Sequence, residues 1–392
     1  MVDQNISESN VLTRDFILAF FAFFCFASAF HSLTPTLPIF LAGLGSAKQD
    51  IGILVGTIGM SSLGFRFVVG RLLGKYHEKQ ILLWGMAAFG LTFLALAVVQ
   101  PFWPFFTVRL IQGVAFACLD TAVIAYVIRI MPLQYRTRVI NYFMLAPPLA
   151  SGLATSTSVF VMNGWGFTAV LLGCTGLALC AFLLITQFEG RANPAIVSES
   201  LAEKRRFFEK KIVAPALVSF LCVFSSGGIL AFYPLYAVQC GVRNPGVLFS
   251  AMAIMFILSR LTSGRILSVY NKERILIISV LIMMSSLTIL AFSSTLPMFI
   301  LVGLLWGIGF GIAFPLMMAY SLEYAGSSDG IAIATYQAFM DLGLALGPAV
   351  AGILLPLTGY RMMFLSQAMV CVISLLYFQF YLRKRVKSTR TI

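Results

Sequence analysis

The sequence is short of charge: Asp, Glu, Lys and Arg make up 10% of its 392 residues, whereas 60% are hydrophobic. A soluble domain carries about 25% charged and about 45–50% apolar residues. With a mean hydropathy of +0.95, the chain has too few polar side chains to cover a surface exposed to water. These numbers exclude a soluble enzyme and indicate a membrane protein with little mass outside the bilayer.

Residues that bind metals or carry covalent catalysis are also scarce. The chain has two histidines and seven cysteines, and the cysteines lie in apolar runs without a Cys-x-x-Cys pair. The chain also lacks the Gly-x-x-x-x-Gly-Lys-Ser/Thr loop that cradles nucleotide phosphates. We therefore expect no metal, no cofactor, no ATP-driven pumping and no enzymatic activity.

What the sequence does have is a series of apolar runs, and a spanning helix needs about 20 such residues. The pattern predicts an all-α membrane protein with twelve transmembrane helices, near 15–42, 50–73, 80–99, 103–129, 138–160, 166–187, 212–238, 246–267, 275–293, 297–322, 330–356 and 360–382. We expect two six-helix bundles, at 1–187 and 212–392, joined by a polar linker at 188–211. The second bundle ends in a short basic tail.

Lys and Arg are distributed unevenly over the loops. With the N-terminus placed inside, 23 of the 27 lie on the inner side, and three lie outside: Lys48, Arg243 and Arg361. Because positive residues mark cytoplasmic loops, both termini are expected in the cytoplasm. The net charge of +13 then reflects topology, and we expect no nucleic-acid partner.

The two halves repeat each other at a shift of 194 residues, as expected of duplicated transporter bundles. The repeat aligns two basic inner loops, after the second and the eighth segment. Their shared glycines and basic residues make a candidate inner gate, formed by Arg66, Gly70, Arg71, Lys75, Arg260, Gly264 and Arg265.

The first of these loops resembles the inner-loop signature of the major facilitator superfamily, and the likeness covers nearly the whole chain. The signature's usual aspartate is missing, since Gly74 and Ser268 occupy its two positions. Arg109-Leu-Ile-Gln112-Gly113 is similar to the family's fourth-helix signature. The resemblance implies alternating access between two bundles, with helices 1, 4, 7 and 10 lining a central cavity.

Two further elements look like the sugar-efflux and multidrug-efflux branch of that family, which works by proton antiport. One is Phe232-Tyr-Pro-Leu-Tyr236, and the other is Asn244-Pro-Gly246 ahead of the basic loop. Gly347-Pro348 is similar to the antiporter Gly-Pro element but lies in the other half. The branch resemblance implies export of a small organic molecule.

Ionisable residues inside the membrane are costly and mark functional sites. Asp341 and Asp120 are the candidate proton carriers, because burial disfavours the ionised carboxylate. His31 is a third candidate, since histidine changes charge near neutral pH. The alternatives are structural: a carboxylate locked by hydrogen bonds from a helix end or a residue such as Gln337, and a histidine that caps a helix.

Arg109, Gln112, Phe116 and Asp120 form one stripe on the fourth helix, in which Arg109 and Asp120 lie about 16 Å apart. Arg109 either binds an anionic substrate group or satisfies backbone carbonyls. Polar and aromatic side chains on the cavity-lining helices, together with Gln337, are the candidate substrate contacts: Phe24, Ser28, Arg109, Gln112, Phe116, Phe232, Tyr233, Tyr236, Trp306, Phe310 and Gln337.

These observations favour a proton-coupled secondary transporter that exports a sugar, drug or amphipathic metabolite, driven by the proton gradient without a further cofactor. Two alternatives stay open: a proton symporter that imports a carboxylate or another metabolite, and a receptor or lipid-handling protein on the same fold. The expected partners are a small-molecule substrate, protons and the lipid bilayer. We expect a monomer in a bacterial inner membrane.

Overall fold

The computed structural model describes residues 13–99, 102–131, 136–189, 210–269, 271–325 and 330–382. Every element in these residues is helical. The first half contains α1 (Arg14–Gly43), α2 (Lys48–Leu73), α3 (Glu78–Val98), α4 (Phe102–Ile130), α5 (Arg136–Phe143) and α6 (Ala146–Thr186). The second half contains η4 (Lys210–Ile212), α7 (Val213–Ser225), α8 (Gly227–Ala231), α9 (Tyr233–Gln239), α10 (Gly246–Val269), α11 (Lys272–Phe292), α12 (Leu296–Ala325), α13 (Gly330–Tyr377) and the π-helical turn η5 (Phe378–Leu382).

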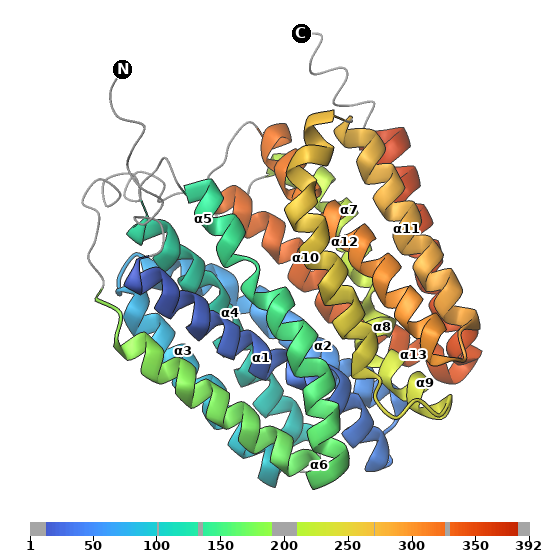
Figure 1. Ribbon diagram of the computed structural model, residues 1–392, viewed down its shortest axis with the longest axis horizontal. Coiled ribbons are helices and arrows are strands. Elements are labelled where there is room, and N and C mark those ends of the chain that lie inside the picture. Colours follow the sequence, from blue (N-terminus) through green and yellow to red (C-terminus); the bar gives the residue numbers. More distant parts are fainter. Residues whose placement is uncertain are drawn as a thin grey trace.

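Two elements are too long to be single spans. With 41 and 48 residues, α6 and α13 would be about 60 and 70 Å long if straight, twice the thickness of the hydrocarbon core. Each contains one glycine with a positive φ, Gly166 at 83° and Gly359 at 73°. L-residues rarely adopt that conformation. Figure 1 shows α6 turning back on itself at the lower edge of the view.

Nine helical stretches of the described residues are long and apolar enough to cross a membrane. The expected segment 212–238 is a broken helix, made of α7, α8 and α9, with Pro234 at the start of α9. The expected segment 138–160 is broken in the same way. There α5 ends at Phe143 and α6 begins at Ala146, just before Pro147 and Pro148. Proline has no backbone N–H and cannot donate to the carbonyl four residues earlier, so the helical hydrogen bonds are interrupted ahead of each of these prolines.

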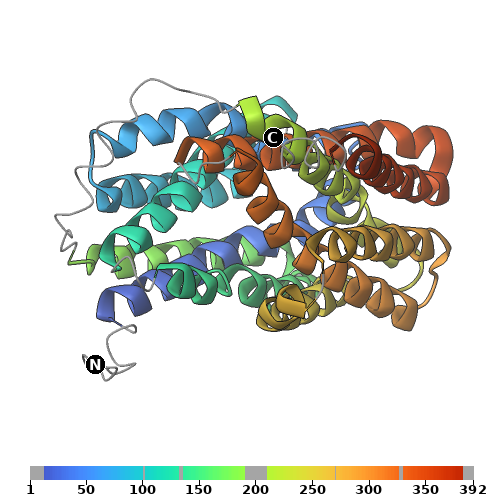
Figure 2. The ribbon, with the colours of Figure 1, turned by 90° about the horizontal axis from the view of Figure 1, so that it is seen from above.

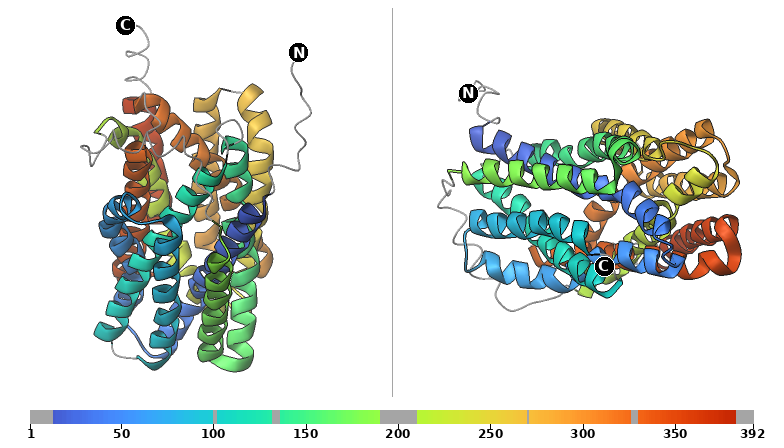
Figure 3. Two further views of the ribbon diagram at one scale, coloured as in Figure 1. Left: turned by 90° about the vertical axis from the view of Figure 1, so that its left-hand side faces the viewer. Right: turned by 90° about the horizontal axis from the view of Figure 1, so that it is seen from below.

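The two halves form bundles that lie side by side (Figures 2 and 3). In the first half α1 packs along α6, and α3 lies between α4 and α6. In the second half α12 packs against α10 and α11. Two long contacts join the halves: α2 runs along α13, and α6 runs along α10. The site described below lies in the first of these seams.

Small residues let the backbones of α2 and α13 touch. Gly52, Gly56 and Gly59 lie one turn apart on α2 and face the backbone of α13. A Cβ at Gly59 would lie 2.6 Å from the Ala345 nitrogen and 2.7 Å from the Asp341 carbonyl oxygen, closer than real Cβ atoms approach. This close approach brings side chains farther along α2 within reach of Asp341.

Candidate functional site

Arg66 of α2 reaches across the seam between the halves and binds Asp341 of α13. Its Nε donates to Oδ2 at 2.7 Å, and its Nη2 donates to Oδ1 at 3.2 Å. This two-point arrangement is the strong geometry for an arginine–carboxylate pair. Both side chains are buried, with 6% and 7% of their surface exposed. One ion pair therefore connects the two bundles inside the membrane-spanning part of the fold.

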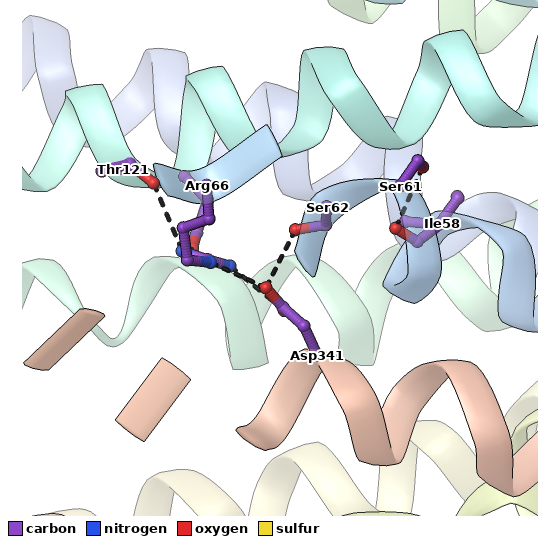
Figure 4. Close-up of polar contacts among 7 residues, drawn as sticks. Ile58, Ser61, Ser62, Arg66, Thr121 and Asp341 are labelled. Carbon is purple, nitrogen blue, oxygen red and sulfur yellow. Dashed lines mark hydrogen bonds and ion pairs between the residues drawn. The ribbon is translucent and has the colours of Figure 1, made fainter. Parts of the chain in front are cut away.

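The same guanidinium also binds a carboxylate of its own bundle. Nη1 of Arg66 donates to Asp120 Oδ2 on α4 at 3.0 Å and to the Thr121 hydroxyl at 3.2 Å. On the other side, the Ser62 hydroxyl donates to Asp341 Oδ2 at 3.1 Å. Figure 4 shows these contacts in sequence, from Thr121 to Arg66, from Arg66 to Asp341, and from Asp341 to Ser62. We call Ser62, Arg66, Asp120, Thr121 and Asp341 the charge cluster.

The charges of this cluster do not balance. One guanidinium faces two carboxylates, so the cluster has a net charge of −1 when both are ionised. Buried ions without a partner cost several kcal/mol. A single proton on either carboxylate brings the cluster to neutrality and still leaves Arg66 paired with the other. The contact between the bundles therefore holds two carboxylates that share one cation.

The sequence identified Arg66, Asp120 and Asp341 separately, and the structure brings them together. Arg66 was expected in an inner gate with the basic loop, whereas Asp120 and Asp341 were expected to carry protons. Asp341 is held by Ser62 and Arg66, not by Gln337. Gln337 lies half-buried one turn earlier on α13. The sequence does not predict this pairing, because Arg66 and Asp341 are 275 residues apart. One signal was available: Arg66 lies inside the expected apolar segment 50–73, where a charged residue needs a partner.

Arg109 contacts neutral hydrogen-bond acceptors in this structure, and a role in substrate binding stays a prediction. Its Nε donates to the Leu54 carbonyl of α2 at 3.1 Å, and its Nη1 donates to Gln112 Oε1 at 2.6 Å. Both Arg109 and Gln112 are buried, with 4% and 1% of their surface exposed. Arg109 and Asp120 lie on one helix, as expected, but Asp120 pairs with Arg66. Arg109 forms no ion pair with a carboxylate of the described residues.

The second copy of the repeat is not equivalent to the first. Arg260, which corresponds to Arg66, donates to the Met144 carbonyl of the first bundle at 3.2 Å. Its guanidinium carbon also lies 5.2 Å from the centre of the Phe256 ring. The positions that correspond to Asp341 and Asp120 hold Pro147 and Phe314. In the seam between α6 and α10, Arg260 thus contacts a main-chain carbonyl and an aromatic ring.

The remaining residues of the expected inner gate lie near helix ends. Gly70 and Arg71 are exposed in the last turn of α2, and Lys75 is exposed in the turn that follows. Gly264 and Arg265 belong to α10, in a stretch whose burial and side-chain contacts lie outside the described part. A role for these residues in gating stays a prediction.

The aromatic residues predicted to face a cavity are packed inside the bundles in this structure. Phe232, Tyr233 and Trp306 are almost fully buried in the second bundle. Tyr233 packs edge-on against Phe299, and Trp306 stacks on Phe310. Buried aromatic rings such as these are typical of the core of a helix bundle. The prediction that they form the wall of a substrate cavity is therefore untested.

The other residues predicted to contact substrate or protons on α1, α4 and α9 differ in burial and in the groups that they contact. The Tyr236 hydroxyl donates to the Ser293 carbonyl at 2.6 Å. Phe116 packs against Phe26 and Phe30. His31 is half-buried and has an edge contact with Phe30 at 5.1 Å. On the same helix, Ser28 is buried and Phe24 is half-buried.

Comparison with known proteins agrees with this architecture. The family model described as the Major Facilitator Superfamily matches residues 19–327 and again residues 217–392. The staphylopine export protein of Staphylococcus aureus is 21% identical over 371 residues, which cover 89% of this chain and 91% of that protein. The multi-drug resistance efflux pump PmrA of Streptococcus pneumoniae is 24% identical over 389 residues, 93% of this chain and 96% of PmrA.

Solved transporters share the fold. The nucleoside transporter NupG has a TM-score of 0.71 at 17% identity, over 95% of this chain and 100% of that one. The xylose transporter XylE from E. coli, in a partially occluded inward-open conformation, has a TM-score of 0.75 at 12% identity, over 94% and 98%. The chain therefore belongs to the major facilitator superfamily, and it is a multi-pass membrane transporter, not an enzyme, with bacterial efflux proteins among its relatives.

Proposed function

We propose that this protein exports a small organic molecule by proton-coupled alternating access, with the charge cluster as the coupling element. The observation that carries the proposal is the ion pair between Arg66 and Asp341, which joins the two halves that must move apart. The proton gradient supplies the energy, and no further cofactor takes part. The protein works as a monomer in a bacterial inner membrane.

The proposal includes twelve spans with both termini in the cytoplasm. The turns at Gly166 and Gly359 divide two of the nine apolar stretches, which makes eleven spans. The apolar part of α10, Gly246–Thr262, adds the twelfth. The excess of Lys and Arg in alternate loops supports the cytoplasmic placement of the termini.

In the proposed cycle, Arg66 is paired with at least one carboxylate at every stage. When Asp341 is ionised, Arg66 binds it and holds α2 against α13. When Asp341 is protonated, Arg66 keeps its bond to Asp120 and Thr121, which belong to its own bundle. The second bundle is then free to move. The presence of Asp120 avoids a buried, unpaired guanidinium, which would make the movement costly.

Export is favoured over import because the relatives include an export protein and an efflux pump. The opposing candidate is proton symport of an anionic metabolite, which a buried arginine such as Arg109 would suit. The direction of substrate flux under a fixed pH gradient separates the two. Under an inward proton gradient, an exporter depletes substrate from the compartment that receives protons, whereas a symporter fills it.

The test is transport in proteoliposomes with an imposed pH gradient. Because one relative is named a quinolone resistance protein, a fluorescent quinolone is a reasonable first probe, followed by a panel of sugars and amphipathic compounds. We expect Asp341→Asn to abolish gradient-driven flux but to retain exchange without a gradient. If Asp341→Asn and Asp120→Asn both leave gradient-driven flux unchanged, the coupling assignment is wrong.

A further inference from the structure

Arg109 is a buried cation without a buried anion. Within the described part of the chain its two hydrogen-bond acceptors are neutral, the Leu54 carbonyl and Gln112 Oε1. Only 4% of its surface is exposed. A charge in such a place needs a partner of opposite sign, because its hydration has been lost and neutral acceptors replace only part of it. Arg66 satisfies this requirement with two carboxylates, and Arg109 does not.

Unused hydrogen-bond donors accumulate next to Arg109. A guanidinium has five N–H groups, and the two bonds described above use two of them. Gln112 Nε2 carries two more and is buried without any acceptor. Gln112 lies three residues after Arg109, on the same face of α4. The pair thus offers a positive charge and several donors, directed at no acceptor of the described residues.

The charge cluster cannot supply the missing anion. Asp120 lies eleven residues farther along α4, about 16 Å away, and is bound to Arg66. The cluster has one negative charge in excess, and Arg109 has one positive charge in excess. The charge cluster at the contact between the bundles and the Arg109 site therefore have opposite net charges at different depths, and a monovalent anion bound at Arg109 would neutralise its charge.

We propose that Arg109 and Gln112 form a binding site for one monovalent anionic group, either a carboxylate of the transported molecule or a free chloride ion. The guanidinium supplies the charge, and Gln112 Nε2 supplies a further hydrogen bond. The carboxylate version rests on the proposed export function, whereas the chloride version does not. Both versions use the same residues and the same chemistry.

The experiment measures the apparent melting temperature of the purified full-length protein in detergent at pH 7.5. Sodium acetate or sodium chloride replaces sodium gluconate at constant ionic strength. We expect a saturable rise with at least one of the two small anions. Arg109→Gln should abolish this rise. Gln112→Glu places a carboxylate beside Arg109, so this variant should melt higher than the native protein in gluconate and should no longer respond to either anion.

The outcomes separate the sources of the anion. A response to acetate alone supports the substrate carboxylate, and a response to chloride supports the inorganic ion. The proposal is overturned if the native protein responds to neither, or if the response persists in Gln112→Glu. That variant decides the question even if Arg109→Gln fails to fold. Since no pH gradient or flux is involved, failure here is distinguishable from failure of proton coupling.

Discussion

Arg66 on α2 and Asp341 on α13 form a two-point ion pair, with donor–acceptor distances of 2.7 and 3.2 Å, across the boundary between the two bundles. The two residues lie on helices that also touch through their backbones at Gly59. A contact that combines close backbone packing with a titratable pair can change its strength when one proton arrives.

Asp341→Asn should make the conformation insensitive to pH, because an amide cannot accept the proton that releases Arg66. Spin labels at Lys75→Cys and Arg274→Cys, both exposed and in different halves, report the separation of the bundles. The background carries serine at the native cysteines. We expect the native distance distribution to change between pH 8 and pH 5.5, and the variant to keep the low-pH distribution throughout. A pH response equal to that of the native protein would contradict the assignment.

Asp120→Asn should shift the midpoint of the same conformational change to lower pH. With an amide in place of the Asp120 carboxylate, release of Asp341 leaves Arg66 with neutral acceptors alone in the cluster, so the released state becomes less favourable. The distance measurement across pH tests this shift, and a midpoint that moves to higher pH would exclude the exchange of partners.

Arg66→Leu should destabilise the protein strongly at neutral pH, since it leaves the buried carboxylate of Asp341 and the partly buried one of Asp120 without a cation. Breaking a buried ion pair from one side costs about 3–5 kcal/mol. The loss should shrink in acid, where a proton replaces the missing cation. Arg66→Lys is the control, because it keeps the charge but not the two-point geometry. Melting curves of the three proteins at pH 5.5 and pH 8 provide the comparison.

Gly59→Ala should disfavour this conformation, because a Cβ there would lie 2.6 Å from the Ala345 nitrogen. Overpacking of this kind costs about 1–3 kcal/mol. Gly64→Ala on the same helix is a matched control, since no atom lies within 4 Å of its added Cβ. The control should change stability by no more than about 1 kcal/mol, in the stabilising direction. Equal effects of the two changes on the melting temperature would rule out a special role for the α2–α13 contact.

Arg260→Met should leave the pH response of the bundle distance unchanged. Arg260 donates to the Met144 carbonyl, which does not titrate. The variant should weaken the α6–α10 seam at every pH alike, which a lower melting temperature with an unchanged pH profile would show. A shifted midpoint would mean that both seams take part in proton coupling.

The sequence predicted the helical class and the family because both depend on local features, namely apolar length and short motifs. Its segment boundaries at 160–166 and 356–360 fall at Gly166 and Gly359, where the chain turns. The charge cluster could not be predicted in full, because the distance between Arg66 and Asp341 depends on how α2 packs against α13. The burial of Tyr233 could not be predicted either. Helical spacing shows which residues share a face of a helix, but not whether that face lines a cavity or packs inside the bundle.

The difference between Arg66 and Arg260 has a consequence for how the protein tolerates genetic change. The bond from Arg260 ends on a main-chain oxygen, which is present whatever side chain stands at position 144. The bond from Arg66 ends on the side chain of Asp341, which a single nucleotide change can remove. A mutation at the acceptor position therefore removes the bond between Arg66 and Asp341 more easily than the bond between Arg260 and the Met144 carbonyl.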